Sequence, residues 1–307
     1  MKISIVIPIF NEAENIAELL SRLALSLGSL SDYEILLVDD GSTDHSGPLI
    51  VRYCEQDNRI KLISFSRNFG HQIAISAGMK HATGDALIVM DGDLQDPPEV
   101  LPQFIAKWQE GYEVVYAIRQ KRKENIFKRI LYRIFYRVLS KLSPFHIPLD
   151  SGDFGIVDRK IYSILNAFPE RNKFIRGLRA WTGYRQIGIA YERAARLKGT
   201  PKFTFRKLVK LAYDGLLSFS DVPLKLASWL GFLFVLVSVV SIMILIVMKL
   251  YSDRINLQGW TSTIIVILFI GGLQLLLLGI FGEYISRIFD EVKQRPEFIV
   301  SKKVNLE

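Results

Sequence analysis

Residues 86–98 read ALIVMDGDLQDPP, an apolar run that ends abruptly in alternating carboxylates and two prolines. The apolar residues before Asp91 are bounded by turn-forming residues, a pattern that predicts a short buried strand. Asp91 and Asp93 would then lie at the carboxyl end of that strand, where open α/β sheets bind their ligands. Gly92 permits a bend that could aim both carboxylates at one point.

Two carboxylates held this close repel each other unless a cation lies between them. Hard oxygen ligands suit Mg²⁺ or Mn²⁺, and such ions usually bridge to substrate phosphates. The sequence therefore predicts a divalent cation at Asp91 and Asp93, with a solvated acidic turn as the alternative.

Neighbouring segments predict the rest of the sheet. Further strands are expected over residues 2–10, 33–38, 60–65 and 114–119, separated by segments with helical periodicity. Strands that alternate with helices indicate a doubly wound, mostly parallel α/β sheet. The glycine motifs of dinucleotide enzymes and P-loop NTPases are absent from the sequence, which speaks against both classes.

The composition limits the class of protein. The chain has 307 residues, 50% of them hydrophobic, and a formal net charge of +8. Its mean hydropathy of +0.22 is high for a soluble enzyme, and its basic excess suits nucleic acid or an anionic membrane. The single Cys54 excludes an internal disulfide framework and cannot form a zinc cluster alone. No signal peptide is expected, because the first apolar run is too short.

Other polar residues are candidates for binding. Asp39 and Asp40 follow the second strand, where a carboxylate can accept a hydrogen bond from a ribose hydroxyl or a uracil N–H; a helix-capping cluster is the alternative. Arg67 and Asn68 could face a bound nucleotide, and His71 is as consistent with a structural role. Asp153, in an expected glycine loop, is either a residue that handles an acceptor proton or a turn residue.

A basic amphipathic helix is expected within residues 119–142. Its pattern is typical of a segment on an anionic membrane surface, or of an ordinary packed helix. Its arginines could also bind a phosphate with two hydrogen bonds each.

Two charge-free segments, residues 226–248 and 261–282, are long enough to span a bilayer. Lysines and arginines outside this hairpin predict that both termini are cytoplasmic. The expected organisation is a catalytic domain over 1–202, interfacial helices over 203–225, a transmembrane hairpin over 226–282 and a cytoplasmic tail over 283–307.

Several segments resemble the polyprenyl-phosphate glycosyltransferases, which include the bactoprenol glucosyltransferases and, more distantly, dolichol-phosphate mannose synthase. They include SIVIPIFNEAENI, LLVDDGSTD, SRNFGHQIAISAGM, DSGDFGIVDRK and GEYISRIFDEVKQRPEFIV. The resemblance runs nearly end to end. It implies a GT-A fold of glycosyltransferase family 2 and an inverting transfer from a nucleotide sugar.

The resemblance also implies roles for particular residues. Asp93 and Asp153 are the expected catalytic residues, with Asp153 matching the family's proposed base. The nucleotide site would be lined by Pro8, Glu12, Asp39, Asp40 and Asp91. The ligands of Mg²⁺ or Mn²⁺ would be Asp91, Asp93 and Gln95. The acceptor phosphate would be bound by Arg119, Arg129, Arg133, Arg196 and Lys202. Gly155 replaces a basic residue common in the family, so one phosphate contact is in doubt.

The expected function is transfer of one sugar, from UDP-glucose or another UDP-hexose, to undecaprenyl phosphate at the cytoplasmic face of the inner membrane. The QxxRW element of processive synthases is absent, so a single transfer is expected. The expected partners are the donor, the polyprenyl phosphate lipid and the membrane rather than nucleic acid, and related enzymes imply a homo-tetramer. Two alternatives remain: a metal-dependent nucleotidyltransferase or hydrolase, and a catalytically silent membrane scaffold that recruits a flippase or partner transferase.

Overall fold

The computed structural model describes residues 1–28, 30–120, 151–170, 173–192, 222–251 and 260–306. The chain divides into two compact units. Met1–Gly215 and Arg295–Glu307 form the first unit, and Leu216–Gln294 forms the second. The first unit is therefore built from two separate parts of the sequence.

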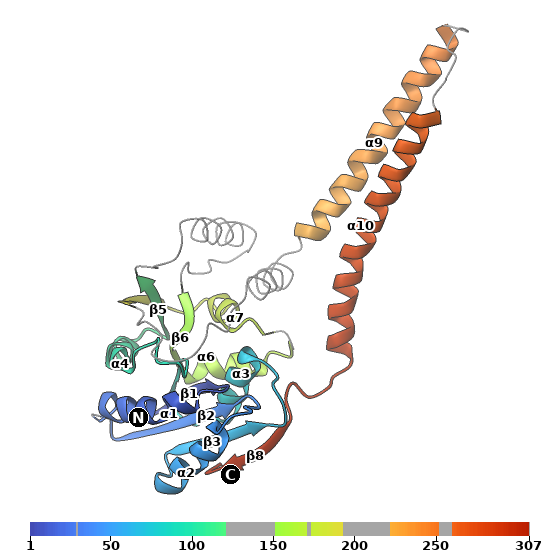
Figure 1. Cartoon of the computed structure of the whole chain (residues 1–307). Coiled ribbons are helices and arrows are strands. Elements are labelled where there is room, and N and C mark those ends of the chain that lie inside the picture. The colour runs from blue at the N-terminus through green and yellow to red at the C-terminus, as the bar shows by residue number, and fades with distance from the viewer. Residues whose placement is uncertain (29, 121–150, 171–172, 193–221, 252–259, 307) are drawn as a thin grey trace. The chain divides into compact units, whose positions relative to one another are not determined.

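An eight-stranded sheet forms the first unit, with the strand order β7-β5-β6-β4-β1-β2-β3-β8 (Figure 1). The central strands β4, β1, β2 and β3 are mutually parallel, whereas β6 and β8 run antiparallel to their neighbours. The strands are β1 (Lys2–Ile9), β2 (Asp32–Asp39), β3 (Ile60–Phe65), β4 (Ala86–Val89), β5 (Val114–Gln120), β6 (Ser151–Asp158), β7 (Gln186–Glu192) and β8 (Val300–Val304). The predicted mostly parallel α/β sheet is confirmed, and its antiparallel strands make it a mixed sheet.

Helices cover both faces of this sheet. They are α1 (Ala13–Ser26), α2 (Ser46–Gln56), α3 (His71–His81), the 3₁₀ turn η1 (Pro98–Val100), α4 (Leu101–Gln109), α6 (Arg159–Ala167) and α7 (Ile175–Trp181). Alternate residues of β1 point to opposite faces. Ile5 and Ile7 join a core that includes α1, α2 and α4. Val6 meets α3 so closely that a Cβ at Gly78 would lie 2.3 Å from its Cγ1.

Asp153 lies in a strand and not in the loop expected from its glycine-rich surroundings. The reason is pairing: β6 is bonded to β4 on one side and to β5 on the other. Gly155 suits this position, because a Cβ there would lie 2.4 Å from the carbonyl oxygen of Val115.

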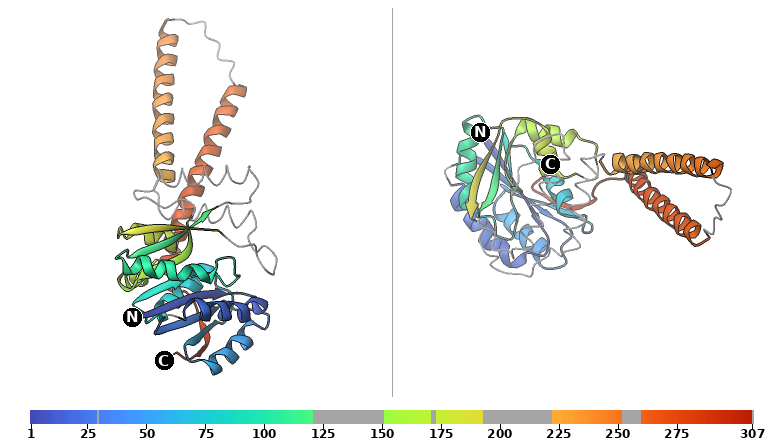
Figure 2. Two further views of the ribbon diagram at one scale, coloured as in Figure 1. Left: turned by 90° about the vertical axis from the view of Figure 1, so that its left-hand side faces the viewer. Right: turned by 90° about the horizontal axis from the view of Figure 1, so that it is seen from above.

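The second unit contains two long helices, α9 (Val222–Tyr251) and α10 (Trp260–Val292), which Figure 2 shows in two views. Both extend beyond the expected apolar spans. The rings of Phe234 and Phe269 lie 5.5 Å apart, so the helices contact each other. Among the described residues, Phe269–Val292 is long and apolar enough to cross a membrane, and Trp229–Ser241 is a shorter apolar helix.

Candidate active site

The carboxyl ends of the central parallel strands bring several predicted site residues to one edge of the sheet. Ile9 at the end of β1 pairs with Asp39 at the end of β2, and Val6 pairs with Val89 of β4. The segments that follow these strands therefore leave the sheet side by side. They carry Glu12, Asp40 and Asp91.

His71, the first residue of α3, lies between two carboxylates. Its Nε2 is 3.5 Å from Oδ1 of Asp91 and 3.7 Å from Oδ2 of Asp153. The side chain of Asp91 is 29% exposed and that of Asp153 only 8%. The site thus has an accessible carboxylate and a buried one joined by an imidazole. Partial desolvation opposes the charge on His71, whose side chain is 44% exposed, but its contacts with Asp153 and Asp91 outweigh this and raise the pKa of His71 to about 9.

Asp153 accepts hydrogen bonds from two further side chains, and a third binds the neighbouring residue. Its Oδ2 accepts hydrogen bonds from Nε2 of Gln72 at 2.8 Å and from Nη2 of Arg176 at 3.3 Å. The buried Arg179 donates to the carbonyl of Gly152, next to Asp153. The other carboxylate oxygen of Asp153, Oδ1, is buried and has no hydrogen-bond partner among the described residues.

The charges around Asp153 favour its ionised form. Burial by itself raises the pKa of this carboxyl. The positive charges of Arg176, His71 and Arg179 lower the pKa by more than burial raises it, so the pKa falls below its ordinary value. A carboxylate with so low a pKa is a weak proton acceptor. The arrangement therefore suits an electrostatic and positioning role better than proton abstraction.

Sequence reasoning did not identify Gln72, Arg176 or Arg179, and it left the role of His71 open. Gln72 and His71 stand in a quoted family-like segment, but nothing in their spacing indicates that they meet Asp153. Arg176 and Arg179 lie on α7, which topology brings to β6. Only the paired basic residues of the segment RGLRAW hinted at a charged helix face.

Asp93 is buried, and its Oδ1 accepts a hydrogen bond from the backbone N–H of Gln95 at 3.1 Å. This bond turns the chain directly after β4. No group of three or more His, Cys, Asp or Glu side chains within the described residues could hold a metal ion. The donors present, Asp91, Asp93 and the amide of Gln95, fit a cation that takes most of its ligands from phosphates and water, as Mg²⁺ does.

Two of the expected nucleotide-binding residues, Asp39 and Asp40, form hydrogen bonds with nearby backbone N–H groups. Asp39 accepts hydrogen bonds from the N–H of Ser42 and the hydroxyl of Ser64. Asp40 accepts from the N–H groups of Phe69 and Gly70, at 2.7 and 3.0 Å. Because these amides directly precede α3, Asp40 fixes the start of the helix that carries His71. Burial, only partly opposed by these bonds, raises the pKa of Asp40.

Two other predicted residues lie at the same edge. Pro8 pairs with Val38 within the sheet, and the backbone N–H of Glu12 donates to the hydroxyl of Ser46. The carboxylate of Glu12 accepts from the amide of Asn15 at 2.6 Å.

The predicted acceptor-phosphate residues are mostly beyond the described part of the chain. Arg129, Arg133, Arg196 and Lys202 lie outside the described residues. The backbone of Arg119 is described: it lies in β5, opposite Tyr191 of β7.

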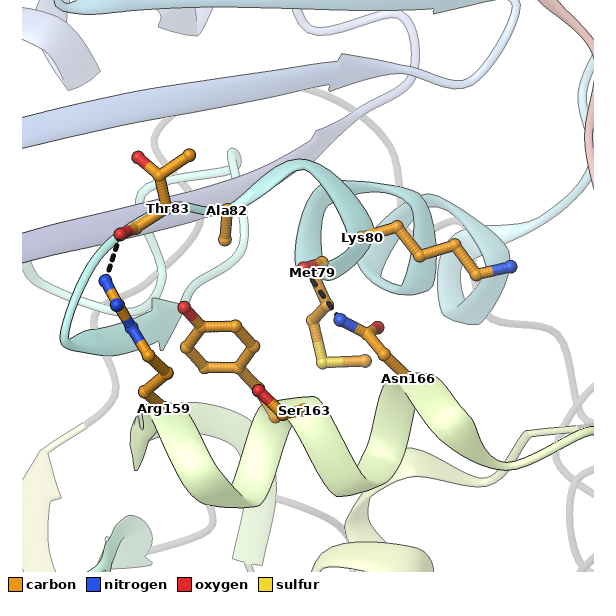
Figure 3. Close-up of a pocket in the computed structure, with 8 residues that line it drawn as sticks. Met79, Lys80, Ala82, Thr83, Arg159, Ser163 and Asn166 are labelled. Atoms are coloured by element: carbon orange, nitrogen blue, oxygen red, sulfur yellow. Dashed lines mark hydrogen bonds between the residues drawn. The ribbon is translucent and has the colours of Figure 1, made fainter.

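A shallow hollow at the opposite edge of the sheet has a structural role (Figure 3). It is lined by Met79, Lys80, Ala82, Thr83, Arg159, Tyr162, Ser163 and Asn166. Thr83 precedes β4, so this hollow lies at the amino end of the strand whose carboxyl end leads to Asp91. Arg159 donates to the carbonyl of Thr83, and Asn166 donates to that of Met79. These bonds fasten α6 to the end of α3.

The sheet topology is that of the GT-A fold. Glycosyl transferase family 2 matches residues 4–165, and the GtrB C-terminal hairpin matches residues 222–288. The chain belongs to glycosyl transferase family 2, and it is a glycosyltransferase with a C-terminal hairpin of apolar helices.

Relatives match the chain over nearly its whole length. The uncharacterized glycosyltransferase YkcC of Bacillus subtilis is 46% identical over 99% of this chain and 94% of its own. A bactoprenol glucosyl transferase of Shigella phage SfII is 38% identical over 98% of each chain. A prophage bactoprenol glucosyl transferase homolog of Escherichia coli is also 38% identical, over 98% of this chain and 99% of its own.

Among solved structures, glucosyl-3-phosphoglycerate synthase from Mycobacterium tuberculosis, in complex with Mn²⁺, UDP-glucose and phosphoglyceric acid, has a TM-score of 0.48 to this chain. The identity is 18%, over 71% of this chain and 79% of that one. A likeness at this level carries no argument about the site.

Proposed function

We propose that the protein transfers a single glucose from UDP-glucose, or another hexose from its UDP donor, to undecaprenyl phosphate with inversion at the anomeric carbon. One observation carries the proposal: relatives named bactoprenol glucosyl transferase match the chain from end to end, including the apolar hairpin. The convergence of Asp91, His71 and Asp153 at the binding edge of the sheet supports it.

In the proposed reaction, a phosphate oxygen of the lipid attacks the anomeric carbon from the face opposite the UDP group. The new bond joins that carbon to the lipid phosphate, the bond to the β-phosphate breaks, and UDP leaves with the electron pair. A phosphate monoester is already largely dianionic at neutral pH, because its second pKa is about 6. The attack therefore needs no strong base from the protein.

The residues of this chain position the reactants. Asp153, which is ionised and hydrogen-bonded to Gln72 and Arg176, would place a fixed negative charge beside the anomeric carbon. Asp40 orders the entry to α3, and thereby places His71 next to Asp91. Asp39, Glu12 and Pro8 would line the nucleotide side of the same edge.

Asp91, Asp93 and Gln95 would hold Mg²⁺ or Mn²⁺ together with the donor diphosphate. Such an ion, when bound, neutralises the negative charge that develops on the leaving nucleoside diphosphate.

The membrane arrangement is a further part of the proposal. Both α9 and α10 would cross the inner membrane, with the catalytic unit and both termini in the cytoplasm. Support comes from the hairpin match and from the exposed apolar side chains of both helices. Arg119, Arg129, Arg133, Arg196 and Lys202 would bind the acceptor phosphate near the membrane surface, and a homo-tetramer is expected from the related enzymes.

A direct assay tests the function. Purified full-length protein with Mn²⁺ or Mg²⁺, undecaprenyl phosphate and a panel of nucleotide sugars should form one glycolipid with a single added sugar and release UDP. Mass spectrometry of the lipid measures the product. Release of free sugar or pyrophosphate without lipid acceptor would support the hydrolase or nucleotidyltransferase alternative instead.

A further inference from the structure

Glu297 lies far along the sequence from the candidate site but belongs to the same compact unit. It follows α10, which ends at Val292, and precedes the edge strand β8. Its side chain is only 15% exposed. The neighbouring Phe298 stacks on Phe65 of β3 at 5.0 Å, so this segment packs against the sheet.

The carboxylate of Glu297 binds groups from two different segments. Oε2 accepts hydrogen bonds from Lys80 at 2.9 Å and from the hydroxyl of Ser76 at 3.4 Å, both on α3. Oε1 lies 3.3 Å from the ammonium nitrogen of Lys173, which is just before α7. Glu297 therefore joins α3 to the segment that leads into α7.

The same two segments hold Asp153. The side chain of Gln72, on α3, donates to Asp153 and accepts a hydrogen bond from the backbone N–H of Ile175, the first residue of α7. Arg176 follows Ile175 and also binds Asp153. The α3–α7 junction is thus fastened at two points, by Gln72 next to Asp153 and by Glu297 at the far end.

Lys173 strengthens the attachment that Glu297 makes. Its side chain is only 4% exposed, and its Nζ has no hydrogen-bond partner among the described residues. The ion pair with Glu297 therefore offsets the cost of burying this positive charge. A buried ammonium group is stable only when paired. Without Glu297, the segment that carries Lys173 would have to move toward water, and Ile175 and Arg176 would move with it.

We infer that Glu297 is a positioning residue for sugar transfer: it locks α3 and the start of α7 in the arrangement that holds Gln72 and Arg176 on Asp153. The inference rests on the proposed function only in assuming that Asp153 serves the transfer step. Catalytic groups must be held within fractions of an ångström, and a displacement of about 1 Å can lower the rate about 100-fold.

The test compares two variants of the full-length protein. Glu297→Gln keeps the shape of the side chain and removes its charge; we expect kcat to fall about 10- to 100-fold, with the KM for the donor within about twofold. Asn305→Gly is the matched control. It removes two hydrogen bonds, to the carbonyls of Cys54 and Ile60 at the other end of β8, and should leave kcat within about twofold.

Hydrogen exchange supplies a readout that needs no activity. In Glu297→Gln, peptides that contain Ile175 and Gln72 should exchange faster than in the unchanged protein, whereas Asn305→Gly should affect only β8 and its neighbours. Equal exchange in all three proteins overturns the inference. If the unchanged protein forms no glycolipid, the proposed function fails, while the exchange result still decides the positioning geometry.

A double variant separates positioning from simple burial of an unpaired charge. Glu297→Gln combined with Lys173→Met leaves no buried ammonium, so it should fold. We expect it to remain slow, because the Glu297 attachment is lost and, among the described residues, α3 is then fastened to the start of α7 only at Gln72. Recovery of full kcat in the double variant, or an equal loss of kcat in Asn305→Gly, would contradict the inference.

Discussion

At the scale of single residues, the positive charges around Asp153 lower its affinity for a proton. Arg176 and His71 contact it directly, and Arg179 lies nearby. These groups stabilise the ionised carboxylate, so the proton affinity of Asp153 is low. Its position on a paired strand, rather than on a mobile loop, fits a fixed electrostatic element.

Asp153→Asn tests this role. We expect kcat to fall about 10-fold, because the variant keeps the shape but loses the charge that orients Arg176 and His71. Loss of a general base would instead lower kcat about 10²- to 10⁴-fold. The measurement is the steady-state rate of glycolipid formation. Asp158→Asn, at the end of the same strand, is the control and should leave kcat nearly unchanged.

Asp93→Ala tests the cation site. Calorimetry on the unchanged protein should show that UDP binds more tightly with Mn²⁺ than without it, because the ion links the carboxylates to the diphosphate. In the variant, this enhancement should be lost. Asp57→Ala, which removes a half-buried carboxylate at the opposite edge of the sheet, should behave like the unchanged protein. Preserved cation-assisted binding in Asp93→Ala would exclude Asp93 as a ligand.

The candidate site could be predicted from the sequence only in part. Carboxylates that directly follow an apolar run, such as Asp91 after β4, are visible because strand ends are visible. The partners of Asp153 were not, because Gln72 and Arg176 come from segments that meet only in the folded sheet. A contact between residues 81 positions apart, such as Gln72 and Asp153, leaves no periodicity in either segment.

At the scale of secondary-structure elements, the strands with strong apolar runs were predicted and those without were not. β4 is fully apolar, and the buried stretch of β1 is apolar except for Ser4, so the sequence pattern of each strand predicts its structure. β8 contains Lys302 and Lys303 and is largely exposed, and β6 contains two glycines. These strands form because a neighbouring strand offers hydrogen bonds, a tertiary effect that overrides local propensity.

Glu34 of β2 fastens the amino edge of the sheet and makes its stability depend on pH. Its buried carboxylate accepts hydrogen bonds from Ser4, Lys61 and Thr83. Burial opposes the charge, but these bonds outweigh it and lower the pKa of Glu34 from 4.5 to about 2. The stabilisation is therefore complete above about pH 4.5 and is lost as the pH falls toward 2.

Glu34→Gln should destabilise the protein by about 3 kcal/mol at pH 7, as expected for a shift of this size. Thermal unfolding of the detergent-solubilised protein at pH 7 and at pH 3.5 measures the effect. The difference in Tm between the unchanged protein and the variant should shrink at the lower pH, because the unchanged protein begins to lose its charge. A difference that is independent of pH would contradict this assignment.

At the scale of the whole molecule, the sequence predicted an apolar hairpin, and the structure contains one. It could not predict that the residues after the hairpin return to the catalytic unit, because β8 has no apolar run that marks it. The proposed orientation of the hairpin rests on the distribution of lysines and arginines around it.

Labelling of single cysteines tests the orientation. Cys54 is buried, and burial raises its pKa to about 11, so it should react little. A membrane-impermeant maleimide applied to intact cells should label Ser252→Cys, in the connection between the two helices. It should label Lys302→Cys, in β8, only after the membrane is opened. The reverse pattern would place the catalytic unit outside the cell.

Return of the chain to β3 has a consequence for biosynthesis. The ribosome makes residues 1–215 first, then both apolar helices, and only afterwards the strand that covers the edge of β3 and the acid that neutralises Lys173. Until then the nascent sheet has an open edge and an uncompensated ammonium. Maturation of the catalytic unit therefore waits until the apolar hairpin has been synthesised.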